Sequence, residues 1–116
     1  MAAKYLRSKG YRILYRNFRS PRGGEVDLVC RDRRADTLVF VEVKTRSGTE
    51  FGRPADAVGR DKQRLIARGA VAWLKLLGHP DILFRFDIVE VVVTDGKPVC
   101  ALLQNAFQIP PPFQDG

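Results

Sequence analysis

An aspartate, a glutamate and a lysine stand in two short segments where neighbouring β-strands are expected. Asp27 lies within Glu25–Cys30, and Glu42 and Lys44 lie within Leu38–Thr45. Both segments are rich in β-branched and other apolar residues, and the polar stretch between them favours a hairpin. Because side chains alternate across a strand, Glu42 and Lys44 share one face of theirs. The hairpin can therefore present two carboxylates and an amine together.

The register of this hairpin decides whether the acids meet. If the loop is centred on the middle of the polar stretch, Asp27 faces Glu42 and Glu25 faces Lys44. Directly opposed side chains have Cβ atoms about 4.5–5.5 Å apart, where two like charges destabilise each other. The acidic pair therefore needs a cation, or else one carboxylate keeps a proton near neutral pH because its neighbour raises its pKa.

A hard divalent cation suits such a pair of carboxylates. Mg²⁺ and Mn²⁺ accept oxygen ligands and keep several waters, so they fit the pair better than zinc. Asp27 and Glu42 are the predicted ligands, and Lys44 beside them can orient a water or stabilise developing negative charge. This set of residues suits phosphodiester hydrolysis.

A purely structural interpretation of the same residues stays open. The chain holds 13 acidic residues, so an acid-x-Lys string downstream of an Asp arises readily by chance. Exposed sheet faces also often carry alternating charges. On this interpretation Glu25 and Lys44 form a surface ion pair, while Asp27 and Glu42 are simply hydrated.

The hydrophobic pattern predicts two helices and five strands. The expected elements are, in order, a helix at 2–9, strands at 11–18, 25–30 and 38–45, a helix at 54–77, and strands at 83–93 and 99–103. In the long helix apolar residues recur at three- and four-residue spacings, and basic residues such as Lys62 and Arg64 are expected mostly on the other side. The order predicts an α/β sandwich in which helices cover a mixed sheet. We expect one domain over residues 1–105 and a Pro-rich tail over 106–116.

The net charge is concentrated at the start of the chain. The 116 residues include 20 Lys and Arg against 13 Asp and Glu, a formal charge of +7. All of that excess precedes Glu25, the first acidic residue. Such a segment is expected to meet a polyanion, either nucleic acid or an anionic membrane surface, although a merely soluble basic surface is the alternative.

The cysteines, the histidine and the hydropathy exclude several classes. Cys30 and Cys100 lie far apart in apolar runs, so we expect buried thiols rather than a disulfide framework or a zinc site. His79 has no second histidine to share a metal with, and it is expected at a helix end. No stretch approaches the roughly 18 apolar residues of a membrane span, and no secretion signal precedes the domain, so we expect a cytoplasmic protein with no membrane partner.

Two strand motifs resemble those of the YraN-like family of bacterial proteins. The matching segments are GEVDLV at 24–29, LVFVEVKTR at 38–46, FGRP at 51–54, Lys62, and RFD at 85–87. That family looks like a branch of the PD-(D/E)xK nuclease superfamily, near the archaeal Holliday-junction resolvases. The resemblance implies a restriction-endonuclease-like fold, a three-layer α/β/α sandwich around a mixed central sheet. It also implies Asp27 and Glu42 as metal ligands and Lys44 as the catalytic lysine.

The start of the sequence departs from this pattern. Relatives usually begin with a further stretch of helix that carries a Gly and a Glu, and resolvases use a carboxylate of that helix at the metal. The present sequence begins at Met1, downstream of that stretch. Glu25 is therefore expected as an auxiliary acid, although it lies nearer to Lys44.

Nucleic acid, DNA in particular, is the expected partner. Phosphate contacts are predicted for six basic residues: Arg16, Arg19, Arg22, Arg46, Lys62 and Arg64. Gly23 and Gly24 would let the backbone approach a phosphate closely. Tyr11, Tyr15 and Phe18 could stack on bases, but packing against the core is the favoured interpretation.

Three functions follow, and they belong to different classes. The first is a Mg²⁺- or Mn²⁺-dependent endonuclease that acts on structured DNA, expected as a homodimer because two strands would be cut symmetrically. The second is a catalytically weak or inactive nucleic-acid-binding module of the same fold. The third is an adaptor that uses the Val-rich strand 88–93 as an edge for self-pairing.

Overall fold

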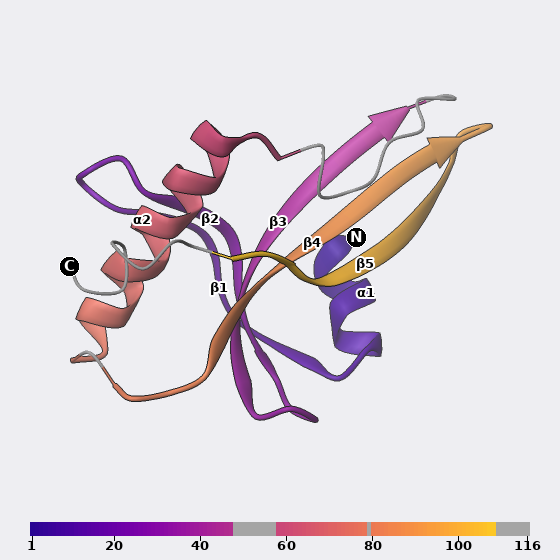
Figure 1. Cartoon of the computed structure of the whole chain (residues 1–116). Helices are drawn as coiled ribbons and strands as arrows, with labels where there is room; N and C mark the ends of the chain where they lie inside the picture. Colours follow the sequence, from indigo (N-terminus) through magenta and orange to yellow (C-terminus); the bar gives the residue numbers. More distant parts are fainter. Residues whose placement is uncertain (48–57, 79, 109–116) are drawn as a thin grey trace.

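The computed structural model describes residues 1–47, 58–78 and 80–108 (Figure 1). The elements are α1 (Ala2–Ser8), β1 (Tyr11–Arg19), β2 (Glu25–Asp32), β3 (Thr37–Ser47), α2 (Arg60–Leu76), β4 (Phe84–Thr94) and β5 (Lys97–Phe107). The five strands form one sheet in the order β1-β2-β3-β4-β5. Strands β3 and β4 pair in parallel and the other neighbours pair antiparallel, so the sheet is mixed, as predicted.

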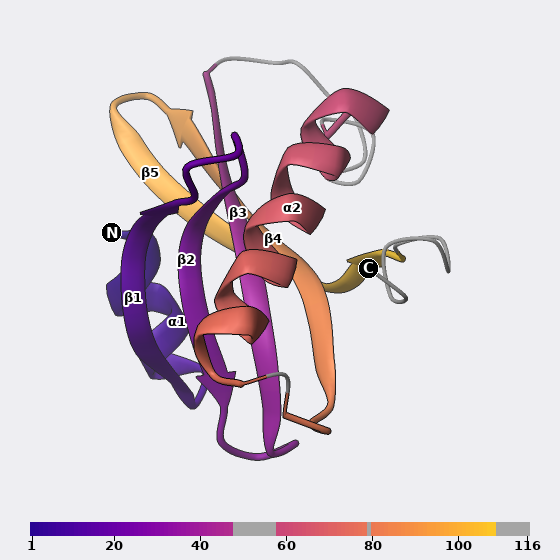
Figure 2. The same ribbon diagram turned by 90° about the vertical axis from the view of Figure 1, so that its left-hand side faces the viewer.

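Helices cover both faces of this sheet. Parallel strands need a crossover connection, and the connection between β3 and β4 contains α2. Figure 2 shows α2 on one side of the sheet and α1 on the other. The predicted α/β/α arrangement is therefore confirmed, and it is consistent with a restriction-endonuclease-like sandwich.

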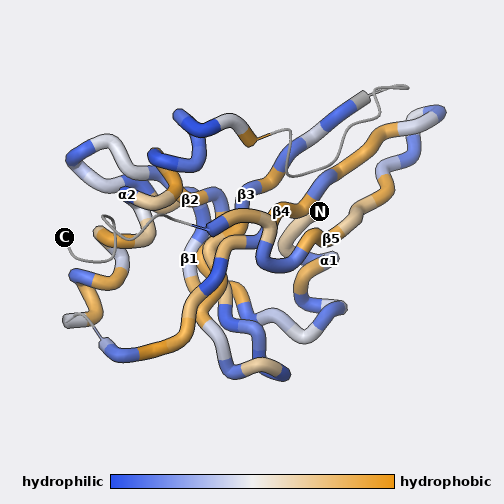
Figure 3. The backbone as a smooth tube through the Cα atoms, in the orientation of Figure 1, coloured by the Kyte–Doolittle hydropathy of each residue, from blue (hydrophilic) through white to orange (hydrophobic). Residues whose placement is uncertain are grey.

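Alternation along the central strands divides the core into two clusters. On the α2 side, Phe40 packs with Ile66 and Ile88. On the α1 side, Val39 packs with Leu6 and other apolar residues. Figure 3 shows β4 as hydrophobic over most of its length, which a strand with both faces covered requires.

The C-terminal strand is longer than the sequence predicted. Strand β5 continues to Phe107, so Ala106 and Phe107 of the expected tail belong to the sheet and pack against the core. The ring of Phe107 stacks on Phe86 with centroids 5.0 Å apart. The remainder of the expected tail, from position 109, lies outside the described residues, as do His79 and the first four positions of the helix expected at 54–77.

The position of β4 contradicts the adaptor hypothesis. That hypothesis needs an unprotected Val-rich strand, but β4 pairs with β3 on one side and β5 on the other. The Val-rich segment is therefore an interior strand, and its backbone groups are not free to pair with a second chain.

The helices and the cysteines of the described residues contain neither a membrane span nor a disulfide. Neither helix has the length and the apolar character that crossing a membrane requires, within the residues that the structure describes. Both cysteines are free thiols; Cys30 is buried and Cys100 is partly buried. Burial raises the pKa of the Cys30 thiol to about 12.

Two glycines let α2 approach the sheet more closely than side chains would allow. A Cβ atom at Gly24 would lie 2.6 Å from the carbonyl carbon of Arg68 and 2.8 Å from Cα of Gly69. A Cβ atom at Gly69 would lie 2.8 Å from Cγ2 of Val26. Gly24 was expected to admit a phosphate, and that expectation is wrong because the glycine is buried beneath the helix.

We expect Gly24→Ala to lower the free energy of unfolding by about 3 kcal/mol, because backbone atoms of α2 would have to move away from the added methyl group. Denaturant unfolding followed by circular dichroism measures this. Gly59→Ala is the matched control, since a Cβ there meets nothing within 4 Å; it should cost less than about 1 kcal/mol. Equal losses in the two variants would contradict the close-packing argument.

Candidate functional site

The hairpin of β2 and β3 has the register that brings the acids together. Leu28 pairs with Val41, and the pairing continues to Asp32 and Thr37 at the turn. These are the partners expected from a loop centred on the polar stretch. The ladder stops at Leu28, and beyond it Oδ2 of Asp27 accepts a hydrogen bond of 2.8 Å from the backbone N–H of Val43. Asp27 thus replaces a backbone acceptor and is held beside β3.

Glu42 is the buried acid of the site. It is only 6% exposed, and burial, followed by the charge of Asp27, raises its pKa to about 7. Its Oε2 atom is buried and has no hydrogen-bond partner among the described residues. A carboxylate oxygen in this condition is costly unless it is protonated or meets a cation.

Lys62 supplies the amine that contacts these acids. Its Nζ donates a hydrogen bond to Oε1 of Glu25 and lies 3.6 Å from Oε1 of Glu42. Lys62 was expected on the outer side of the long helix, and that expectation is wrong. Lys62 precedes the buried Ile66 by four positions and the buried Gly69 by seven, so all three lie on the stripe that faces the sheet. The spacing of four and seven positions from Ile66 and Gly69 was the sequence feature that could have placed Lys62 on the inner side of the helix.

Glu25 and Lys44 do not form the ion pair that the structural interpretation required. The ion pairs of Glu25 in the described part of the chain are with Lys62 and with Arg19, the latter at 3.5 Å. The hydrogen bond from Lys62 holds the pKa of Glu25 below its ordinary value. Lys44 is exposed two residues beyond Glu42 on β3. Glu42 is buried rather than hydrated. The purely structural interpretation therefore fails for the expected Glu25–Lys44 ion pair and for the expected hydration of Glu42.

Glu90 is a second buried carboxylate on this face, and sequence reasoning missed it. It is the β4 partner of Lys44, and its Oε2 lies 3.6 Å from Nε of Arg46. The two side chains are 11% and 14% exposed, and this Oε2 also has no hydrogen-bond partner among the described residues. The sequence feature that could have revealed it is a single acid within the apolar run from Ile88 to Val93. An acid buried in such a run needs a cation nearby.

The other predicted phosphate-binding arginines are spread over β1, the loop after it and α2. Arg16, Arg19, Arg22 and Arg64 are all exposed. The structure connects Arg19 to the acidic cluster through Glu25. Arg64 instead lies 3.8 Å from Asp61 on the surface of α2.

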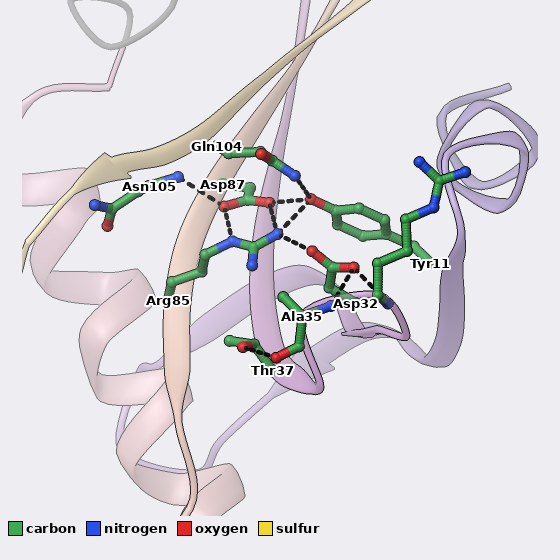
Figure 4. Close-up of polar contacts among 9 residues, drawn as sticks. Tyr11, Asp32, Ala35, Thr37, Arg85, Asp87, Gln104 and Asn105 are labelled. Atoms are coloured by element: carbon green, nitrogen blue, oxygen red, sulfur yellow. Dashed lines mark hydrogen bonds and ion pairs between the residues drawn. The ribbon is translucent and has the colours of Figure 1, made fainter.

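A separate polar network ties the opposite side of the sheet together (Figure 4). Asp87, which is fully buried, accepts hydrogen bonds from the Tyr11 hydroxyl at 2.6 Å, Arg85 Nε at 3.0 Å and the backbone N–H of Asn105 at 2.9 Å. Arg85 also donates to Asp32 at 2.7 Å. The RFD segment therefore joins β1, β2, β4 and β5, which is a structural role.

The aromatic residues of β1 are mostly packed. Tyr11 is buried, and burial raises the pKa of its hydroxyl to about 12. Phe18 is buried beside Trp73 with ring centroids 5.3 Å apart. Tyr15 is 50% exposed and packs on Trp73 at 5.6 Å. Only Tyr15 of the three keeps a ring that a base could reach, so the packing interpretation holds for the other two.

Comparison with known proteins places the chain in a family. The model of a family described as "Uncharacterised protein family UPF0102" matches residues 1–91. The chain belongs to the UPF0102 family. A UPF0102 protein of Trichlorobacter lovleyi is 47% identical over 109 residues, which cover 93% of this chain and 84% of the relative. A UPF0102 protein of Symbiobacterium thermophilum is 50% identical over 107 residues, which cover 91% and 88%. The resemblance to the YraN-like family is thereby confirmed.

The acids of this UPF0102 chain fit a hard divalent cation that keeps much of its water. Asp27 and Glu42 offer carboxylate oxygens side by side, and Oε2 of Glu42 lacks a partner within the described ranges. No three His, Cys, Asp or Glu side chains converge as a metal cage in the part of the chain that the structure describes. A pair of carboxylates completed by water is a common arrangement for Mg²⁺.

Glu42 makes the stability of the metal-free protein depend on pH. Its pKa is about 7 when folded against 4.5 for the free side chain, so the folded state holds the proton more tightly. Stability should then be lost as pH rises from 4.5 through 7. The test is denaturant titration in EDTA at pH 5.5 and at pH 8. Between these two pH values the free energy of unfolding of wild type should fall by about 2 kcal/mol more than that of Glu42→Gln, which has no proton to lose. Parallel curves for the two proteins would refute the raised pKa.

Proposed function

We propose that this chain is a Mg²⁺- or Mn²⁺-dependent endonuclease that hydrolyses phosphodiesters of structured DNA. The observation that carries the proposal is the buried carboxylate of Glu42, which stands beside Asp27 with one oxygen unpartnered among the described residues. Burying the Glu42 carboxylate beside that of the half-buried Asp27 destabilises the fold, and this cost is offset when a divalent cation binds them.

Asp27 and Glu42 would hold the cation. When bound, the ion would act as a Lewis acid that polarises a phosphoryl oxygen. The hydrogen bond from the Val43 N–H fixes the orientation of the Asp27 carboxylate at 2.8 Å. Exposed Lys44 would place its ammonium group against the phosphate, where it stabilises developing negative charge and orients the attacking water.

The basic residues around the acids would bind the DNA backbone. Arg46 is held at the end of β3 by Glu90, and Arg19 reaches the acids through Glu25. Exposed Arg16, Arg22 and Arg64 would add phosphate contacts farther out. Symmetric cutting of two strands requires two such sites, so we expect the working enzyme to be a homodimer.

One observation favours a second function. Lys62 already neutralises part of the acidic charge, and no third acid joins Asp27 and Glu42 in a metal cage within the described residues. A chain with weak metal affinity would be a nucleic-acid-binding module of the same fold. It would bind DNA with an affinity that falls steeply with salt and would cut little of it.

Metal binding tests the first function directly. Calorimetric titration with Mn²⁺ should give a saturable isotherm in wild type, and Asp27→Asn should weaken binding at least about tenfold because one anionic ligand is lost. Asp36→Asn is the matched control, since Asp36 is an exposed acid in the β2–β3 turn. Absence of binding in wild type would overturn the nuclease proposal.

Cleavage separates the nuclease from the binding module. With Mn²⁺ and a labelled four-way DNA junction, Lys44→Met should lower the cleavage rate about 100-fold while Mn²⁺ affinity changes little, because the ammonium group acts on the phosphate. Lys97→Met, which removes an exposed lysine at the start of β5, should cleave like wild type. Retention of the junction by wild type without cleavage would instead support the module.

A further inference from the structure

Lys62 occupies an electrostatically unfavourable position in its helix. Helix α2 begins at Arg60 after Gly59, so Lys62 lies in the first turn. The N-terminal end of a helix carries partial positive charge, which favours acids and disfavours cations there. The carboxylates of Glu25 and Glu42 are the groups that offset this cost.

The docking of α2 directs Lys62 at these carboxylates. Gly69, on the same stripe of the helix, packs against the backbone at Glu25 and the side chain of Val26, where there is no room for a Cβ atom. The helix backbone is therefore fixed over β2, close to the acids. The Lys62 side chain is still 35% exposed, so the ammonium group can turn toward solvent without moving the helix.

The charges around Lys62 remain unbalanced. Three carboxyl groups, those of Glu25, Asp27 and Glu42, surround the ammonium group, and the other cation near them among the described residues is Arg19, 3.5 Å from Glu25, so the acids still outnumber the cations. Its closest contact is with Glu25, and it lies 3.6 Å from only one oxygen of Glu42. Lys62 thus stands where positive charge is needed while leaving the second oxygen of Glu42 open, as described above.

We propose that Lys62 is an internal counter-ion that competes with the divalent cation for Glu42. This inference rests on the metal site of the proposed function. When Asp27 and Glu42 hold a cation, the ammonium group of Lys62 would be repelled and would withdraw toward Glu25 and solvent. Lys62 thus acts through Glu42: its ammonium group weakens metal binding until it is displaced. Glu25 then keeps the displaced ammonium group near the site.

Manganese affinity measured by electron paramagnetic resonance, at pH 8 under argon, tests the proposal. Lys62→Met should bind Mn²⁺ about tenfold more tightly than wild type, because the positive charge 3.6 Å from a carboxylate oxygen of Glu42 is removed. The pH lies above the Glu42 pKa of about 7, so protonation of Glu42 cannot mask the gain. Lys62→Arg, which keeps the charge, and Lys75→Met, which removes an exposed charge at the far end of α2, should both bind like wild type.

The outcomes separate this inference from the proposed function. If wild type binds no Mn²⁺, the metal site itself is wrong and both fall. If wild type binds and Lys62→Met binds equally or more weakly, only the counter-ion role is overturned. A second measurement follows the six lysine side-chain NMR signals during addition of Mg²⁺ to wild type. The Lys62 signal, identified by its absence from the spectrum of Lys62→Arg, should shift. Unchanged signals at saturating Mg²⁺ would refute the displacement of Lys62.

Discussion

The contact between the backbones at Gly24 and Gly69 sets the geometry of the whole α2 side of the protein. Side chains normally separate a helix from a sheet, but here the absence of two Cβ atoms lets α2 lie directly on the start of β2. That approach places the first turn of the helix over the end of the β2–β3 ladder. As a result Lys62 reaches acids that come from two different strands.

The two faces of the sheet differ in how their buried acids are hydrogen-bonded. On the α2 side, buried carboxylates at Glu42 and Glu90 each keep an oxygen without a hydrogen-bond partner among the described residues. On the other side, Asp87 is equally buried but accepts four hydrogen bonds from three residues. A satisfied buried acid stabilises a fold, whereas an unsatisfied one is tolerated where a ligand can complete it. The contrast within a single sheet supports assigning chemistry to one face and stability to the other.

Much of the site could be derived from the sequence because it depends on local rules. Strand alternation and a symmetrical turn were enough to pair Leu28 with Val41 and so to bring Asp27 next to Glu42. Lys62 could not be placed in the same way, because its role depends on how α2 rotates and docks. The buried Gly69 shared its stripe and marked the side facing the sheet, but a helical glycine acquires that meaning only when a second backbone is known to approach it.

The single parallel pairing, between β3 and β4, has a consequence for how the chain acquires its structure. Strands β1 to β3 form a meander of neighbours in sequence, and β4 with β5 forms a hairpin, so each unit depends on short-range contacts. Joining them requires closing a long loop that contains α2, which is the slow step in a topology of this kind. The acidic residues of β2 and β3 also precede Lys62 in the chain, so they gain its positive charge only when α2 packs on the sheet.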